Sequence, residues 1–193
     1  MVSMEHSNSL SIWKSAGLFC LVSLTAFSLW AFQIEFLQGA SLLYPAIALV
    51  FILGGAPSML PAYRKNNGSR GQIKYLLIFW PAFIVFAAGW WIFWEMFLNH
   101  TGEIFGSFLG LSGMVLIFTC CFRTTRSRAS LVATSFAWYT INYYLADFCY
   151  NELKSINGTW AIPASRLIWG LFFGIGMGTA LAFITDSLRQ KTA

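Results

Sequence analysis

Charged residues are scarce in this chain. Asp, Glu, Lys and Arg make up 10% of its 193 residues, whereas 58% of the residues are hydrophobic. These charges are too few to coat a separate water-soluble domain, because such domains keep most of their charged side chains on the surface. The composition therefore predicts a single domain that lies mostly in lipid.

The chain has only two histidines, and its four cysteines are not arranged in metal-binding pairs. His6 and His100 cannot supply the paired axial ligands of a membrane b-type haem. The four cysteines form no CxxC pair and no histidine stands at zinc-ligand spacing, which predicts free thiols. The chain also lacks a Ser/His/Asp set within its apolar stretches, an HExxH motif and a phosphate-binding Gly-Lys loop. We therefore expect no metal, no cofactor and no catalytic residue.

Six long apolar stretches fill most of the chain. Each is close to the roughly 20 residues that cross a hydrocarbon core, which predicts an all-α polytopic membrane protein with six transmembrane helices. The predicted spans are about 15–36, 41–62, 74–97, 104–122, 129–150 and 161–185. The membrane domain would cover residues 15–186, between polar tails at 1–14 and 187–193. The first stretch is long enough to be a helix, so we expect it to be retained and not cleaved as a signal sequence.

The gaps between these stretches alternate in charge, which predicts their orientation. Two gaps are purely basic and should be cytoplasmic, because positively charged short loops are retained on that side. Their basic residues are Arg64, Lys65, Arg70, Lys74, Arg123, Arg126 and Arg128. The gap near Glu95 and Glu103 holds no Lys or Arg. Both termini are therefore predicted to be cytoplasmic, in a plasma membrane or bacterial inner membrane. Most of the +5 net charge lies in the basic loops, where anionic lipid would attract it. The charge therefore needs no nucleic-acid partner to explain it, and none is expected.

Glycines recur every three or four residues in two of the predicted spans. A small residue at this spacing lets a second helix approach closely, which predicts helix contacts within one subunit or between subunits. The glycines are Gly106, Gly110 and Gly113 in one span, and Gly170, Gly174 and Gly178 in the other. Prolines mark a third span, at 41–62, which must bend because a proline removes a helical hydrogen bond. They are Pro45, Pro57 and Pro61.

The predicted span at 129–150 carries the most polar face inside the bilayer. Its polar residues follow i, i+3, i+4, i+7 spacing and therefore share one side of a helix. They are Thr140, Tyr143, Tyr144 and Asp147, with Asn142 nearby. Two interpretations stay open: these side chains line a narrow solute path, or they form hydrogen bonds with other helices.

Arg166 is predicted near the outer end of the last span. The topology puts Asp147 and Glu152 at the same level of the bilayer. Arg166 therefore either forms a structural ion pair with one of these carboxylates or attracts an anionic substrate at the mouth of a path.

Several short motifs occur in the order found in one transporter family. The clearest is Glu103-Ile-Phe-Gly-Ser-Phe-Leu-Gly-Leu-Ser-Gly113, followed by Phe122-Arg-Thr-Thr-Arg126. Gly54-Gly55, the Asn/Gly loop ending at Gly71, and Phe79-Trp80 precede them. Together they resemble the acetate uptake transporter family, also called succinate/acetate permeases. The resemblance implies a path through each protomer and a ring-like homo-oligomer, a hexamer. It assigns no constriction residue.

The leading hypothesis is a membrane channel or transporter for a small monocarboxylate such as acetate, or for a similarly small solute. The predicted outer surface is acidic and would repel anions, so passage of the protonated acid or proton-coupled movement fits this field better. The alternative is a non-catalytic membrane subunit that packs into a larger hetero-oligomeric complex through its glycine-rich helices. A third hypothesis is an enzyme that acts on membrane lipid through Glu35, Glu95 or Asp147.

Overall fold

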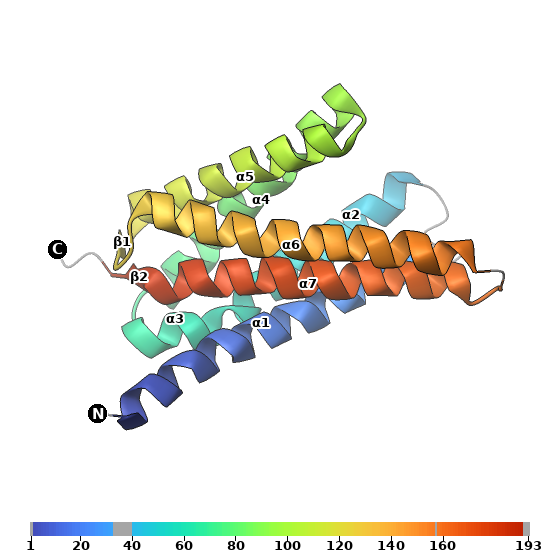
Figure 1. Cartoon of the computed structure of the whole chain (residues 1–193). Helices are drawn as coiled ribbons and strands as arrows, with labels where there is room; N and C mark the ends of the chain where they lie inside the picture. Colours follow the sequence, from blue (N-terminus) through green and yellow to red (C-terminus); the bar gives the residue numbers. More distant parts are fainter. Residues whose placement is uncertain (1, 33–39, 157, 191–193) are drawn as a thin grey trace.

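The computed structural model is a bundle of long helices that run side by side (Figure 1). It describes residues 2–32, 40–156 and 158–190. Glu35 lies outside the described residues. In chain order the elements are α1 (Val2–Ala31), α2 (Ala40–Ser58), α3 (Leu60–Asn67), α4 (Gln72–Phe97), α5 (His100–Cys121), β1 (Arg123–Thr124), α6 (Arg128–Ser155), α7 (Ala161–Ser187) and β2 (Leu188–Arg189). The expected all-helical domain is therefore confirmed, apart from one pair of very short strands.

Five helical segments in the described part are long and apolar enough to cross a membrane. They are Leu10–Ala31, Leu42–Asn67, Gln72–Phe97, His100–Cys121 and Ala161–Ser187. The sixth predicted span coincides with α6, whose 28 residues extend about 42 Å at the usual helical rise. It lies along α7 (Figure 1) but carries more polar residues than the other five. A sixth crossing therefore stays a prediction.

The two ends of the bundle differ in charge. The start of α1, α3 and the two strands lie at one end, which we call the basic end (Figure 1). Its charged residues are Lys14, Arg64, Lys65, Arg70, Lys74, Arg123, Arg126, Arg128 and Arg189, with two acidic residues, Glu5 and Asp186. The α4–α5 and α6–α7 connections lie at the opposite end, which we call the acidic end. Its described charges are Glu95, Glu103, Asp147 and Glu152, with Lys154 and Arg166. The predicted separation of charge is present, and which side of a membrane each end faces stays a prediction.

The predicted irregularity in the second span is an interruption of the helix at Met59. Helix α2 ends at Ser58 and α3 begins at Leu60, with Pro61 in the first turn of α3. Proline suits that position, because the first turn of a helix has no partner for its N–H groups. The Ser58 hydroxyl donates a hydrogen bond to the Gly55 carbonyl at 2.7 Å, which gives a partner to a carbonyl group near the end of α2.

Regular secondary structure extends into both segments outside the predicted membrane domain. Helix α1 begins at Val2, so most of the 1–14 tail continues the first span, and no Pro or Gly interrupts residues 2–16. At the other end, β2 pairs antiparallel with β1, with Thr124 opposite Leu188. The start of the 187–193 tail is therefore held by backbone hydrogen bonding.

Both glycine sets serve contacts inside the chain. On α7, a Cβ added at Gly174 would lie 2.8 Å from the Cys20 Cα atom of α1. On α5, a Cβ added at Gly110 would lie 2.7 Å from the Phe86 carbonyl oxygen of α4. Gly106, Gly113, Gly170 and Gly178 are likewise closed in by side chains or backbone of α4 or α1. These close contacts pair α1 with α7 and α4 with α5.

Aromatic rings form a continuous column through the interior of the bundle. Each ring in this column lies within 6.2 Å of the next, measured between ring centroids. From the basic end to the acidic end, the rings are Tyr63, Tyr75, Phe79, Phe83, Phe86, Tyr139, Tyr143, Trp169, Tyr150 and Trp30. The column fills the space that a central path would need.

Candidate functional site

The polar face predicted on α6 is divided between the interior and the surface. Tyr143 is buried, Thr140 and Asp147 are half-buried, and Tyr144 is 45% exposed. Asn142 is buried on another side of the helix. There its Cβ would be 2.7 Å from a Cβ added at Gly176 of α7, and its Nδ2 donates to the Trp138 carbonyl at 2.9 Å. Asn142 therefore serves helix packing in this structure.

Glu103 on α5 joins the buried part of this face. Its carboxylate and the Tyr143 side chain influence each other electrostatically. Tyr139, one turn earlier on α6, is coupled in the same way to Ser107. The Ser107 hydroxyl donates to the Glu103 backbone carbonyl at 2.7 Å. Asp147 stands one turn after Tyr143 on α6 and acts on it through its charge. We call these five residues the acid–tyrosine cluster.

The cluster reaches the surface through a histidine. His100 Nδ1 lies 2.9 Å from Glu103 Oε2, and this pair carries an ionic interaction only when the imidazole is protonated. The His100 side chain is 63% exposed, whereas that of Glu103 is 12% exposed. The helix start is fixed by Asn99, whose Oδ1 accepts the Gly102 N–H at 3.1 Å. Glu103 thus lies between an exposed imidazole and the buried tyrosines.

The bundle contains two helix pairs, α4–α5 and α6–α7, and the cluster takes residues from one helix of each pair. The α4–α5 pair diverges from the α6–α7 pair toward the acidic end (Figure 1). Further from that end the pairs touch, for example where the rings of Phe108 and Phe136 lie 5.3 Å apart and edge-to-face. The cluster therefore lies at a seam between two helix pairs.

Neither of the two best-formed surface hollows in the described part of the chain adjoins this seam. One is an open hollow on the outer face of α6, lined by residues that include Ala137 and Ile141. The other lies at the basic end. Beside the cluster the interior is filled, since Phe86 packs edge-on against Tyr139 and Trp169 packs edge-on against Tyr143. A solute path at the seam would require the two helix pairs to move apart.

Arg166 has a different partner from the one expected. Its Nη1 donates to the Trp30 carbonyl at 2.8 Å, and its guanidinium lies 4.8 Å from the centre of the Trp30 ring. Neither Asp147 nor Glu152 forms an ion pair with it among the described residues. Asp147 instead accepts from the Asn151 amide at 3.2 Å. The contacts of Arg166 with Trp30 pack the start of α7 on the end of α1, which the charge pattern does not reveal.

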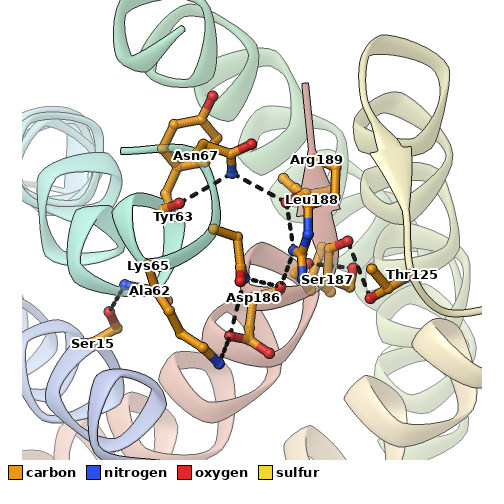
Figure 2. A network of polar contacts seen from close by, with 12 residues as sticks. Ser15, Ala62, Tyr63, Lys65, Asn67, Thr125, Asp186, Ser187, Leu188 and Arg189 are labelled. Carbon is orange, nitrogen blue, oxygen red and sulfur yellow. Dashed lines mark hydrogen bonds and ion pairs between the residues drawn. The ribbon is translucent and has the colours of Figure 1, made fainter. Parts of the chain in front are cut away.

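A second polar network lies at the basic end and was not predicted (Figure 2). Lys65 Nζ lies 2.6 Å from Asp186 Oδ1, and the two side chains are only 20% and 15% exposed. The Asn67 amide donates to the carbonyls of Tyr63 and Leu188, both at 3.1 Å. This network, with the two strands, fastens α3 and the end of α7 to the connection between α5 and α6.

The sequence held a weak signal for each site. Glu103 and Ser107 are four residues apart and therefore share a face of α5, next to the glycines that bring α4 close. Asp186 is an acid within a region of basic residues. Within the described residues, no group of three or more His, Cys, Asp or Glu side chains is placed to hold a metal ion.

Comparison with known proteins adds no relative to this picture. No family model, curated protein or solved structure matches the chain. The resemblance to the acetate uptake transporter family is therefore untested and stays a prediction. The arguments for function rest on the geometry alone.

Proposed function

We propose that this chain is an integral membrane transporter or channel for a small solute, with the acid–tyrosine cluster as part of its path. The observation that supports this proposal is the position of the cluster. Two carboxylates and two tyrosine hydroxyls lie at the seam between diverging helix pairs, at the acidic end. Ionisable residues inside a membrane are costly and usually mark a pathway for an ion or substrate.

The chemistry of the cluster favours a solute that carries no negative charge when it binds. Glu103 and Asp147 would repel a carboxylate anion, whereas they accept hydrogen bonds from a protonated acid, a neutral solute or a cation. A small monocarboxylic acid such as acetic acid fits if it enters with its proton. Glu103 would accept that hydrogen bond, and His100 would link its carboxylate to the outside solution.

A specific observation also favours the second candidate, a non-transporting subunit of a larger membrane complex. The aromatic column fills the interior, and large apolar side chains cover the outer faces of α4 and α6. Because the glycines already pair helices within the chain, a partner would contact these outer faces instead. On α6 that face includes Trp138, Ile141, Leu145 and Phe148. A homo-oligomeric ring, such as the hexamer implied by the resemblance, would use the same surfaces.

The test is uptake into liposomes that contain the purified protein, with labelled acetate and an imposed pH difference. Glu103→Gln keeps the size of the side chain and removes its charge. Glu95→Gln is the matched control, since Glu95 is exposed at the same end and lies outside the cluster. Hydrogen bonds to charged groups are worth about 1.5–3 kcal/mol, so we expect flux at low substrate to fall about 10- to 150-fold in Glu103→Gln. The control should keep the wild-type rate.

The two candidates give different results. Saturable flux that depends on Glu103 supports the transporter. Equal loss in both variants would show that the cluster is not the path. The subunit would be favoured by two results together. The folded protein would give no flux above empty liposomes, and it would purify from its native membrane in a fixed ratio with another protein.

A further inference from the structure

A surface hollow lies at the basic end, between the end of α3 and the beginning of α4. It has a volume of about 470 Å³ and is open to the outside. Its lining residues are Arg64, Ser69, Gly71, Gln72 and Ile73. Gly68 and Gly71 have φ angles of +56° and +64°, a conformation that glycine adopts without strain, and so they turn the chain sharply around the hollow.

Arg64 gives the lining of the hollow a positive charge, and a second arginine stands next to the lining residues in the chain. Arg64 contributes to the lining, and its Nη2 donates to Gln72 Oε1 at 2.8 Å, which holds the guanidinium at the rim. Arg70 is exposed and stands between two lining residues, Ser69 and Gly71. A guanidinium presents a planar set of donors that suits phosphate.

No carboxylate is among the lining residues of the hollow. Of the two acidic residues at the basic end, Asp186 is engaged by Lys65 at 2.6 Å, and Glu5 belongs to the first turns of α1. The lining of the hollow is therefore complementary to an anion.

An apolar stripe leads away from the hollow along α4. Ile73 belongs to both features, because it lines the hollow and is 76% exposed. Leu77, Trp80 and Ile84 continue the stripe with exposures of 55%, 39% and 54%. The spacing of four, three and four residues places all four side chains on one face of the helix.

We infer that this hollow binds the headgroup of an anionic phospholipid. Its phosphate would lie against Arg64 and Arg70, and one acyl chain would follow the stripe that starts at Ile73. Free phosphate could use the arginines but gains nothing from the stripe, whereas a zwitterionic lipid uses the stripe and gains less from the arginines. The inference rests on the proposed membrane placement of the bundle and does not depend on transport.

The test is lipid binding by the purified, delipidated full chain, followed by native mass spectrometry in detergent. The probes are dioleoylphosphatidylglycerol, dioleoylphosphatidylcholine and inorganic phosphate. Arg64→Gln with Arg70→Gln removes two charges from the hollow. Arg126→Gln with Arg128→Gln is the matched control, because it removes two exposed charges from the same end.

We expect phosphatidylglycerol to bind more tightly than phosphatidylcholine. A basic residue near anionic lipid contributes about fivefold in affinity, so the Arg64 and Arg70 double variant should bind phosphatidylglycerol about 25-fold more weakly. The control pair should change the affinity less than about threefold, since charge effects decay over a Debye length. Ile73→Ser should weaken phosphatidylglycerol and leave any phosphate binding unchanged.

Three results would overturn the inference. Equal losses in the two double variants would indicate diffuse attraction and no defined site. Equal affinities for the two lipids would remove the role of charge. Phosphate that binds in the hollow and competes with phosphatidylglycerol, with no effect of Ile73→Ser, would assign the site to a free anion. Because binding is measured without transport, a failure of the transport assay would leave each of these results interpretable.

Discussion

Gly174 offers the sharpest test of how the first and last helices pack. A Cβ at this position would lie 2.8 Å from the Cys20 Cα atom and 2.9 Å from the Ser23 Cβ atom. Favourable carbon–carbon contacts lie at about 3.5–4.0 Å, so Gly174→Ala would push α1 and α7 apart by roughly 1 Å. Overpacking of this kind costs about 1–3 kcal/mol. We therefore expect Gly174→Ala to lower the stability of the bundle.

Gly17 provides the matched control on the partner helix. It lies on an exposed side of α1, and no atom is within 4 Å of an added Cβ. Gly17→Ala should be neutral or stabilising, because alanine is favoured over glycine in a helix by up to about 1 kcal/mol. The same chemical change therefore has opposite signs at the two positions, with a difference of about 1–4 kcal/mol.

Thermal unfolding in a mild detergent, followed by circular dichroism, measures this difference. For a chain of this size 1 kcal/mol shifts Tm by about 2–4 °C, so the two variants should melt about 2–16 °C apart. Equal midpoints, or a Gly174→Ala variant that is more stable than Gly17→Ala, would refute the argument that glycine sets the distance between α1 and α7.

Two further predictions concern the basic end and the aromatic column. Asp186→Asn leaves Lys65 without its carboxylate, and we expect a loss between the roughly 1 kcal/mol of exposed pairs and the roughly 3 kcal/mol of buried ones. A double-mutant cycle with Lys65→Gln should recover most of that loss, and full additivity would show that the pair contributes nothing. Phe79→Ala removes a fully buried ring and should cost about 3–5 kcal/mol, whereas Leu77→Ala, at an exposed position, should cost under about 1 kcal/mol in detergent. Similar midpoints for these two variants would contradict the proposed packing of the column.

The features that depend on local sequence were predictable. Apolar runs of about 20 residues predicted the long helices. Pro57 and Pro61 predicted that the second span does not stay regular, and the structure ends a helix at Ser58. Glycine spacing predicted close helix contacts, because the need for a small residue at a contact is local.

Partners far apart in the sequence were not predictable. Glu103 and Tyr143 come from different helices, and the charge pattern placed Glu103 only in a gap between spans. Arg166 of α7 contacts the carbonyl and ring of Trp30 in α1, which the charge pattern did not indicate. The glycine pattern similarly left open whether the helices that pack against these glycines belong to the same chain or to another subunit. Each of these outcomes depends on which helices are neighbours, and hydrophobic pattern alone does not determine that order.

The pairing of α1 with α7 has a consequence for biosynthesis. About 130 residues separate the end of α1 from the start of α7, which at 5–20 residues per second corresponds to roughly 6–26 s of translation. During that interval the face of α1 that meets Gly174 and Gly178, which includes Ala16, Cys20 and Ser23, lacks its α7 partner. The nascent α1 would therefore have to wait, in lipid or beside the insertion machinery, and the bundle would close only after its last helix has been made.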